Sequence, residues 1–600
     1  MKKIVFLLLF FLLFYSRSVG LDWGLPYPMH PDERNMADAV LNLKCNVSSF
    51  VLHVSWLKTC FNPNFFAYGQ FNIYLGYIFA LIIHMLRQGM DFNRFDEVII
   101  ALRMISFLSS ILNAFVLFKI FTLLNRSLKW FKPDDNQFFI LKVACWLIII
   151  FVPYGIQFSH FGTTESLLML FYSLISYLSL KVLIEKKHNT FDLLKVAIFC
   201  GLSIATKVSS ISFLLIPIIS IILKELYKKS KYRKLTKVLL SKLLFLIASL
   251  SGIFLIIAVT IIISAIFSWQ SIINWNAFIS TIRYEVGVGD GSIPVFYTRS
   301  FFLSIPIIFQ LIKIFPYALG FSQYFLCIVG FICLSWRKKE YIMLRLFFLI
   351  YFIPTSFLYA KWTRFISPIF PITTLIVIIM LVEIYLLAKK YKLSKLLLNF
   401  GGIILIFLLI IPGISYASIY LNPDVRFSAS KWIYQNITTE SSILSETANV
   451  IDIPILSSFY DTRNIHYDMM VFNFYDLDQD PSLEASLQQN MARANYIIIP
   501  SRRIIYNHTC FEDNFKYPSS ILNGYEPARC NELAKKYPKL NQYYQELISG
   551  KLGFRQVAKI TSYPKISVLG RTIMEFPDES AEETWTVFDH PSVTIYKRYD

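Results

Sequence analysis

Charged side chains are scarce in this chain. Asp, Glu, Lys and Arg make up 16% of the 600 residues, whereas hydrophobic residues make up 55% and the mean hydropathy is +0.52. A soluble globular domain carries more charge and fewer long apolar runs. The composition therefore excludes an ordinary soluble protein and predicts many membrane-spanning helices.

The sequence also has none of the short motifs that identify several common enzyme classes. HExxH, CxxC, the Walker-type phosphate loop and GxSxG are all absent. These motifs place zinc ligands, redox thiols, phosphate-binding amides and an activated serine. Nothing in the sequence points to those chemistries.

The net charge of +19 does not indicate a nucleic-acid-binding protein. Lys and Arg cluster in short segments between apolar runs, which is the positive-inside pattern of a multi-pass membrane protein. These segments are 126–132, 186–187, 224–242, 337–339 and 389–395. Placing all of them in the cytoplasm fixes the predicted orientation.

The apolar runs predict about eleven transmembrane helices. The first run, 4–15, is typical of either a retained helix or a cleaved signal peptide, and Arg17 favours the retained helix. The other spans are expected at about 98–124, 137–155, 165–184, 191–206, 209–225, 239–267, 317–336, 341–360, 365–387 and 397–417. The run 71–86 is short, so we expect a helix lying in the outer interface. With an odd number of spans, the N-terminus is cytoplasmic and the C-terminus is extracytoplasmic.

Two further outer stretches are not expected to cross the membrane. Residues 269–299 contain three closely spaced glycines, and without a preceding strand these predict a flexible loop rather than a phosphate cradle. Residues 300–319 are apolar but interrupted by prolines, so we expect an interfacial or re-entrant segment.

The eight cysteines divide by environment. Four lie in apolar runs. Cys45 and Cys60 lie in the first loop, and Cys510 and Cys530 lie in the polar C-terminal region. Both regions are predicted outside the cytoplasm, where an oxidising compartment favours disulfides. Spacing alone does not establish either pairing.

The character of the chain changes after residue 420, which divides it into a membrane domain, 1–420, and a soluble domain, 421–600. The first extracytoplasmic loop covers 21–97. Strand-like runs in the soluble domain are expected at 442–444, 496–499, 555–560 and 593–596, with helices at 429–436, 483–493 and 540–548. The predicted fold class is a polytopic α-helical membrane protein with a C-terminal extracytoplasmic α/β domain.

The first loop holds the most unusual group of polar residues. Asp32 and Glu33 follow a proline-rich turn and lie between His30 and Arg34, close to the predicted membrane surface. One interpretation is a solvated loop in which Asp32 caps a helix. The other is a pair of functional carboxylates, which the remaining polar residues of the chain favour.

Several ionisable residues occur at the predicted outer ends of helices, where they are costly unless they line a site. They are Arg103, His160, Glu165, Lys207, Lys361 and Arg364. Each one alone is compatible with snorkelling to the lipid headgroups or with a helix-end interaction. Together with the first-loop acids, they predict an outward-facing cavity that binds an anionic lipid headgroup.

This cavity suits the transfer of a sugar from a lipid phosphate to a hydroxyl group. Such a reaction needs a general base for the hydroxyl proton, and Asp32 is the candidate. It also needs cations that stabilise the leaving phosphate. Glu33 is either a second acid or an orienting partner. His30 with Asp32 could bind a divalent cation, but two ligands two residues apart in a loop are weak evidence, so no cofactor is assigned and a divalent cation stays an alternative.

The sequence resembles the lipid-carrier-dependent glycosyltransferases of the C-type (GT-C) superfamily, near the protein O-mannosyltransferases and the ArnT-like aminoarabinose transferases. The segments that carry the resemblance are PYPMHPDERNMADA, FNPNFFAYGQFNIYLGYIF, VIIALRMISFLSSILNA, IQFSHFGTTESLLMLF, GLSIATKVSS and KWTRFISPIFP, in that order. In the tail, SASKWIYQNI, ANYIIIPSRR and AEETWTVFDHPSVTIYKR are similar to segments of bacterial and archaeal members, with no assigned role.

The resemblance implies an inverting transfer from a polyprenyl-phosphate sugar on the outer membrane face. The catalytic Asp corresponds to Asp32, with Glu33 beside it, and the Arg that follows corresponds to Arg34. The segment 68–70 departs from the family, which has Lys or His before Pro-Pro there, so Lys207 or Arg364 would have to hold the phosphate. Glu165 stands where relatives often have Asp, and the WWDYG motif of oligosaccharyltransferases is absent.

Three functions therefore remain in view. The main hypothesis is a multi-pass plasma-membrane glycosyltransferase whose partners are a polyprenyl-phosphate sugar, membrane lipids and an extracytoplasmic acceptor. A lipid or lipid-linked-sugar transporter is the second, although transporters usually show internal repeats and mid-membrane polar residues. The third is a non-catalytic membrane scaffold, for which Asp32 and Glu33 would be dispensable.

Overall fold

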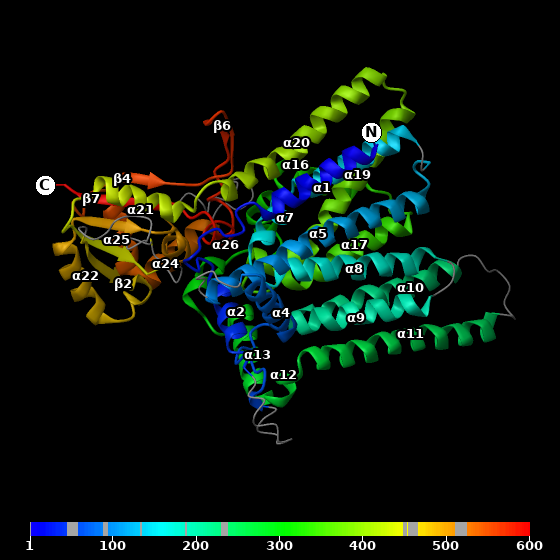
Figure 1. Ribbon diagram of the computed structural model, residues 1–600, viewed down its shortest axis with the longest axis horizontal. Helices are drawn as coiled ribbons and strands as arrows, with labels where there is room; N and C mark the ends of the chain where they lie inside the picture. The colour runs from blue at the N-terminus through cyan, green and yellow to red at the C-terminus, as the bar shows by residue number, and fades with distance from the viewer. Residues whose placement is uncertain are drawn as a thin grey trace.

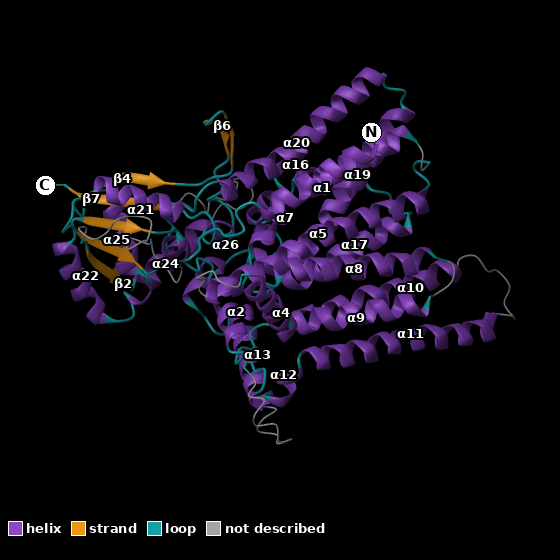
Figure 2. Cartoon of the chain, in the orientation of Figure 1, coloured by secondary structure: helices purple, strands orange, loops and turns teal. Residues whose placement is uncertain are grey.

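The structure, a computed structural model, consists of a long helical bundle with an α/β domain at one end (Figures 1 and 2). It describes residues 2–44, 58–87, 94–132, 135–185, 189–229, 238–447, 453, 466–510 and 525–599. This is the predicted fold class, a multi-pass helical membrane protein with a C-terminal α/β domain.

The helices of the bundle follow the apolar runs of the sequence. They are α1 (Lys2–Ser18), α5 (Arg94–Leu128), α6 (Asn136–Ile150), α7 (Pro153–His160), α8 (Glu165–Ile184), α9 (Thr190–Thr206), α10 (Leu215–Lys229), α11 (Val238–Phe267), α16 (Phe321–Cys333), α17 (Lys339–Ser356), α18 (Thr363–Ile366), α19 (Phe370–Lys390) and α20 (Lys395–Leu421). Two 3-10 segments, η2 (Val208–Leu214) and η4 (Ser367–Ile369), continue α9 into α10 and α18 into α19.

Every predicted span is occupied by a helix or by successive helices. By length and composition, five helices of the described part can cross a membrane, or six if α6 and α7, which meet at a bend of 48°, form one span. Pro153 at the start of α7 explains this break, because its ring cannot continue the hydrogen bonding of α6. The larger count of about eleven crossings stays a prediction.

Shorter helices gather at the end of the bundle that is nearer to the α/β domain (Figure 1). They are α2 (Pro31–Leu41), α4 (Gln70–Leu86), α12 (Trp269–Ile273), α13 (Trp275–Asp290), η3 (Phe296–Phe301), α14 (Ile308–Lys313) and α15 (Phe315–Leu319). The first loop and the C-terminal domain therefore lie at the same end, as the topology prediction requires. Helix α4 covers the run 71–86, and its position in the outer interface stays a prediction.

The expected flexible loop at 269–299 was wrong for most of its length. Residues 275–290 form α13, which includes Gly287 and Gly289, and the helix ends only at Gly291. Gly291 has φ +86°, a left-handed conformation that glycine adopts without strain and that commonly ends a helix. Gly287 allows close packing, since a Cβ there would lie 2.7 Å from the side chain of Ile293, and Gly291 ends the helix, so the glycines do not prevent a helix.

The C-terminal domain is built around a five-stranded mixed sheet in the order β2-β1-β3-β7-β4. Its strands are β1 (Ser442–Glu446), β2 (Asp468–Phe472), β3 (Tyr496–Ile499), β4 (Phe554–Ile560) and β7 (Val593–Arg598). The pairs β1–β2 and β1–β3 are parallel, and the pairs β3–β7 and β4–β7 are antiparallel. The hairpin of β5 (Lys565–Val568) and β6 (Arg571–Glu575) is separate and packs along α20.

Helices cover both faces of this sheet. They are α21 (Val425–Asn436), α22 (Pro481–Arg493), α23 (Arg503–His508), α24 (Tyr525–Lys536) and α25 (Pro538–Ile548), with a 3-10 turn, η5 (Phe474–Asp476). Helix α26 (Glu583–Thr586) packs into the hydrophobic core of the bundle instead. In β3, Ile497 and Ile499 face the cluster formed with α25, whereas Tyr496 and Ile498 face the cluster formed with α21. This alternation is that of a strand buried on both faces. The four predicted strands and three predicted helices are confirmed, and β2, β5 and β6 were not foreseen.

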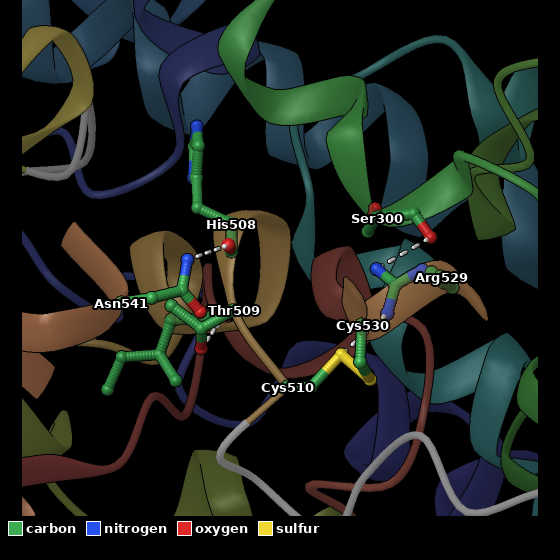
Figure 3. Close-up of a disulfide and its surroundings, with 8 residues drawn as sticks. Ser300, His508, Thr509, Cys510, Arg529, Cys530 and Asn541 are labelled. Atoms are coloured by element: carbon green, nitrogen blue, oxygen red, sulfur yellow. Dashed lines mark hydrogen bonds between the residues drawn. A yellow bond between two sulfur atoms is a disulfide. The ribbon is translucent and has the colours of Figure 1, made fainter. Parts of the chain in front are cut away.

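The predicted Cys510–Cys530 disulfide is present (Figure 3). Beside it, Arg529 donates to the carbonyl oxygen of Ser300 at 3.4 Å, so the disulfide lies where the α/β domain meets η3 of the membrane domain. The other predicted pair cannot be followed, because Cys45 lies outside the described residues. Cys145, Cys200, Cys327 and Cys333 are free thiols, as their apolar surroundings suggested.

Candidate active site

The site is organised by the first turn of α2. Pro31 occupies the first turn, which suits its fixed φ, and His30 is the N-cap: its Nδ1 accepts a hydrogen bond from the Asp32 amide at 3.2 Å. Burial lowers the pKa of His30, partly offset by the negative charges of Asp32 and Glu33, so the ring is neutral and able to accept. The cap is therefore His30 rather than Asp32, which leaves the Asp32 carboxylate available for other contacts.

The Asp32 carboxylate forms an ion pair with the guanidinium of Arg364 on α18. The two side chains are 17% and 20% exposed, so the pair is shielded but still reachable from solvent. Burial would raise the pKa of Asp32, but the charge and hydrogen bond of Arg364, aided by the charge of Lys207, outweigh it and lower the pKa. Asp32 is therefore ionised at neutral pH.

A second cation, Lys207, lies beside this pair at the end of α9. Its Nζ is 3.8 Å from Glu165 Oε1, which is an ion pair too long for a hydrogen bond, and it lies over the rings of Tyr68 and Phe365 at 5.3 and 5.2 Å. The neighbouring Gly69 makes this approach possible, since a Cβ there would lie 2.0 Å from the carbonyl oxygen of Ala205. The segment that departs from the family pattern thus places an aromatic ring, rather than a cation, next to the site.

Asp32, Glu165 and Arg364 line a narrow cleft that side chains nearly fill, with about 20 Å³ of open space. Its lining combines the acids and Arg364 with aromatic rings and hydroxyl groups: His30, Asp32, Gln157, Phe158, Phe161, Thr163, Glu165, Thr363, Arg364, Thr584 and Phe588. The buried Nε of Arg364 has no hydrogen-bond acceptor within the described part of the chain. The cleft therefore offers an ionised carboxylate, a guanidinium with an unused donor, and neutral polar groups in one place.

Glu33 has a different environment from its neighbour. Its two carboxylate oxygens accept hydrogen bonds from Nε and Nη2 of Arg103 at 3.0 and 2.8 Å, and both side chains are fully buried. The amide of Gly162 donates to the same carboxylate. Arg103 also donates from Nη1 to the carbonyl oxygens of Leu21 and Trp23 at 2.9 and 2.8 Å. The Glu33–Arg103 pair thus ties α2, α5 and the start of the first loop together and does not line the cleft.

The remaining predicted residues lie outside the cleft lining. His160 is buried against the carbonyl oxygens of Ile156 and Val19, and its ring stacks on Tyr420 at 3.7 Å. Arg34 is half-buried on the turn after the acids, and its predicted contact with substrate stays a prediction. Lys361 is buried and donates to the carbonyl oxygen of Tyr359 at 3.1 Å.

Two residues of the cleft come from the far end of the chain. Thr584 and Phe588 belong to the segment around α26, which packs into the same hydrophobic core as the bundle, and the ring of Phe588 lies 4.2 Å from that of His30. The tail segment that includes them carried a family resemblance but no role. Only the return of the chain to the bundle brings these two residues to the cleft.

The described residues hold no group of three or more His, Cys, Asp or Glu side chains placed to bind a metal ion. His30 Nδ1 is also occupied by the Asp32 amide. The two-ligand arrangement of His30 and Asp32 therefore gains no third ligand in the described part of the structure, and a divalent cation stays an untested alternative.

Comparisons with known proteins add little to this geometry. No protein-family model matches the chain, and no curated protein matches it. The crystal structure of ArnT from Cupriavidus metallidurans bound to undecaprenyl phosphate matches with TM-score 0.45 and 13% identity, over 83% of this chain and 92% of that chain. The apo form of that ArnT matches with TM-score 0.44 and 12% identity over the same shares. ArnT belongs to the family that the sequence motifs resemble, but TM-scores below 0.5 and identities of 12–13% support no conclusion about function.

Proposed function

We propose that the chain is a GT-C membrane glycosyltransferase that moves a sugar from a polyprenyl-phosphate donor to an extracytoplasmic acceptor, with Asp32 as the general base. The observation that carries the proposal is the Asp32–Arg364 pair at the cleft, with Lys207 beside it. The reaction requires an ionised carboxylate that takes the proton of the acceptor hydroxyl and cations that stabilise the leaving phosphate.

The pair also suggests how the base becomes active. In the free protein Arg364 neutralises Asp32 and makes it a weak base. A donor phosphate competes for the same guanidinium, and Arg364 has a buried Nε that is still without an acceptor. Transfer of Arg364 to the phosphate removes the nearest positive charge from Asp32 and raises its basicity.

The acceptor oxygen forms a bond to the anomeric carbon from the face opposite the phosphate, which inverts that centre. The bond between the anomeric carbon and the phosphate oxygen breaks, and its electron pair leaves with the polyprenyl phosphate. The acceptor proton passes to Asp32. Arg364 and Lys207 stabilise the charge on the departing phosphate.

The other predicted residues take supporting roles in this scheme. Glu33 orients the loop through Arg103 and does not exchange protons with substrate. Glu165 holds Lys207 near the cleft. The membrane domain, 1–420, carries the reaction, the N-terminus is cytoplasmic, and the soluble domain, 421–600, faces the outside together with the first loop, 21–97.

The test is turnover by the detergent-purified protein with a panel of radiolabelled polyprenyl-phosphate sugars, for wild type and Asp32→Asn. We expect the substitution to lower turnover by at least about two orders of magnitude, or about 3 kcal/mol of transition-state stabilisation. Asp38→Asn is the matched control, because Asp38 is an exposed acid on the same helix. Equal turnover in Asp32→Asn and wild type would remove Asp32 as the base.

The same assay separates the rival functions. A donor that binds tightly without being consumed by the wild type indicates a transporter of lipid-linked sugars. Neither binding nor turnover with any donor indicates a scaffold. Both outcomes would overturn the transferase.

A further inference from the structure

The segment 578–590 connects the hairpin β5–β6 to strand β7, yet much of it packs against the membrane domain. Ala581, Trp585, Val587 and Phe588 are buried in the core of the bundle. The amide of Glu582 donates to the carbonyl oxygen of Lys313 at 2.9 Å. This part of the C-terminal domain is therefore built into the end of the bundle that carries the cleft.

The segment touches the residues that hold Asp32. The Glu582 carboxylate accepts hydrogen bonds from the amide and the hydroxyl of Thr363 at 2.9 and 2.8 Å, directly before Arg364. Phe588 lies against the ring of His30, the cap of the Asp32 turn. Both partners of the Asp32–Arg364 pair are thus braced by the same short stretch of chain.

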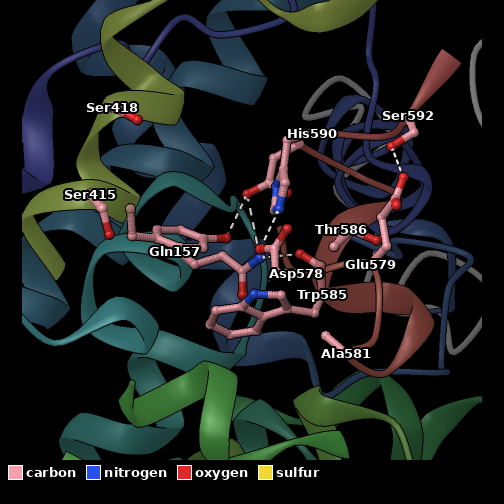
Figure 4. Close-up of polar contacts among 12 residues, drawn as sticks. Gln157, Ser415, Ser418, Asp578, Glu579, Ala581, Trp585, Thr586, His590 and Ser592 are labelled. Carbon is pink, nitrogen blue, oxygen red and sulfur yellow. Dashed lines mark hydrogen bonds and ion pairs between the residues drawn. The ribbon is translucent and has the colours of Figure 1, made fainter. Parts of the chain in front are cut away.

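A buried charged cluster anchors this stretch (Figure 4). His590 lies between two carboxylates, with Nε2 2.9 Å from Asp578 Oδ2 and Nδ1 2.6 Å from Asp589 Oδ1. The other oxygen of Asp589 accepts hydrogen bonds from Tyr420 and Tyr416 of α20 at 2.7 and 3.2 Å.

The cluster reaches the cleft through Gln157. This residue lines the cleft, and its Nε2 lies 2.7 Å from the carbonyl oxygen of Trp585 and 3.4 Å from the same Asp589 oxygen. The two carboxylates outweigh the cost of burial and raise the pKa of His590 to about 10, so the imidazolium is the charged centre of the cluster. A buried cation with two anionic partners fixes geometry firmly, because each group would be costly without the others.

We propose that the 578–590 segment forms the sugar-side wall of the reaction cleft, in which Thr584 and Phe588 contact the transferred sugar and the Asp578–His590–Asp589 cluster is the positioning element that holds them. This inference rests on the proposed transferase function. The ring of Phe588 suits a C–H face of a sugar. The hydroxyl of Thr584 donates to the Glu582 carboxylate, so its oxygen can accept a hydrogen bond from a sugar hydroxyl. The choice of sugar would then depend on the C-terminal domain and not on the membrane domain alone.

The first experiment compares kcat/KM for several polyprenyl-phosphate sugars in wild type, Thr584→Val and Phe588→Leu. We expect the ratio of kcat/KM between sugars that differ at one hydroxyl to change by about tenfold or more, because loss of a pocket contact discriminates on that scale. An unchanged ratio in both variants would overturn the specificity role.

The second experiment tests His590 as a positioning residue. His590→Gln removes the charge and should raise KM for the donor more than it lowers kcat, whereas His590→Lys keeps a cation between the carboxylates and should restore part of the KM. His508→Asn is the matched control, because His508 is a buried histidine of the same domain that does not line the cleft. Equal KM values in His590→Gln, His508→Asn and wild type would overturn the role, as would an equal loss in the Gln and Lys variants.

A labelling experiment separates failure of this inference from failure of the proposed function. Thr584→Cys is introduced into Cys333→Ser, which removes the exposed free thiol, and labelled with a small water-soluble maleimide. We expect a polyprenyl-phosphate sugar to protect the new thiol, whereas polyprenyl phosphate alone protects it less. Turnover without protection overturns the inference and leaves the transferase intact. Absence of both turnover and lipid binding overturns both.

Discussion

Glu33 and Asp32 are adjacent in sequence, but the structure predicts opposite consequences for their substitution. Glu33→Gln keeps the shape of the side chain and removes its charge. The change leaves the guanidinium of Arg103 buried without a counter-charge, because the other partners of Arg103 are the neutral carbonyl oxygens of Leu21 and Trp23. Glu33→Gln should therefore act on stability first.

The magnitude follows from the burial of the pair. Both side chains have no solvent exposure, and breaking such a pair by removing one partner costs about 3–5 kcal/mol. With about 2 °C per kcal/mol for a large domain, the melting temperature should fall by about 6 °C or more. Asp32→Asn, in contrast, breaks a partly exposed pair, and its melting temperature should change much less.

The first assay is thermal unfolding of the detergent-purified variants, measured as the amount of protein that remains monodisperse after heating. The second is turnover at a temperature where all variants are folded. We expect Glu33→Gln to lose stability and to keep most of its turnover when folded. The reasoning would be refuted if Glu33→Gln had the melting temperature of the wild type and lost turnover as strongly as Asp32→Asn. Glu33 would then be a second catalytic acid and not the structural partner of Arg103.

Four further outcomes are expected. Arg364→Ala should raise KM for the donor by at least about tenfold, and Arg364→Lys should raise it less; equal KM values in wild type and both variants would speak against phosphate binding by Arg364. Arg364 lowers the pKa of Asp32 in the free protein, so kcat/KM should fall on the acid side only below the usual pKa range of an aspartate. If the bound donor draws Arg364 away from Asp32, kcat should fall at a higher pH than kcat/KM. Acid limbs at the same pH in both profiles would exclude this movement of Arg364 from Asp32 to the phosphate. The pKa of His590 is raised above its unfolded value, so its stabilisation should be complete below about pH 6.5 and should be lost as the pH rises through about 10, and melting curves of His590→Gln should lack this alkaline loss. Cys510→Ser, which opens the Cys510–Cys530 bridge, should lower the stability of the C-terminal domain by about 3 kcal/mol, measured by its rate of proteolysis, and unchanged proteolysis would show that the bridge contributes nothing.

The sequence by itself determined the parts of the fold that depend on local pattern. Long apolar runs predict helices wherever they occur, because a chain in lipid must satisfy its backbone hydrogen bonds within each segment. The short runs rich in β-branched and aromatic residues at 496–499 and 593–596 similarly predicted the strands β3 and β7. The unusual placement of Asp32 also pointed to a site before any contact was known, since charged residues are rare in so apolar a chain.

The tertiary structure alone decided which polar groups meet. Asp32 and Arg364 are 332 positions apart, and no local pattern shows that they form a pair while the neighbouring Glu33 turns to Arg103 instead. The direction of each carboxylate depends on the helix that begins at Pro31, which places successive side chains on different faces of α2. The return of the 578–590 segment to the bundle was equally hidden, because its contacts with the bundle, such as those of Asp589 with Tyr420 and of Trp585 with Gln157, join residues 150 or more positions apart. Such long-range contacts are set by packing of the whole chain and leave no periodic signal in the segment itself.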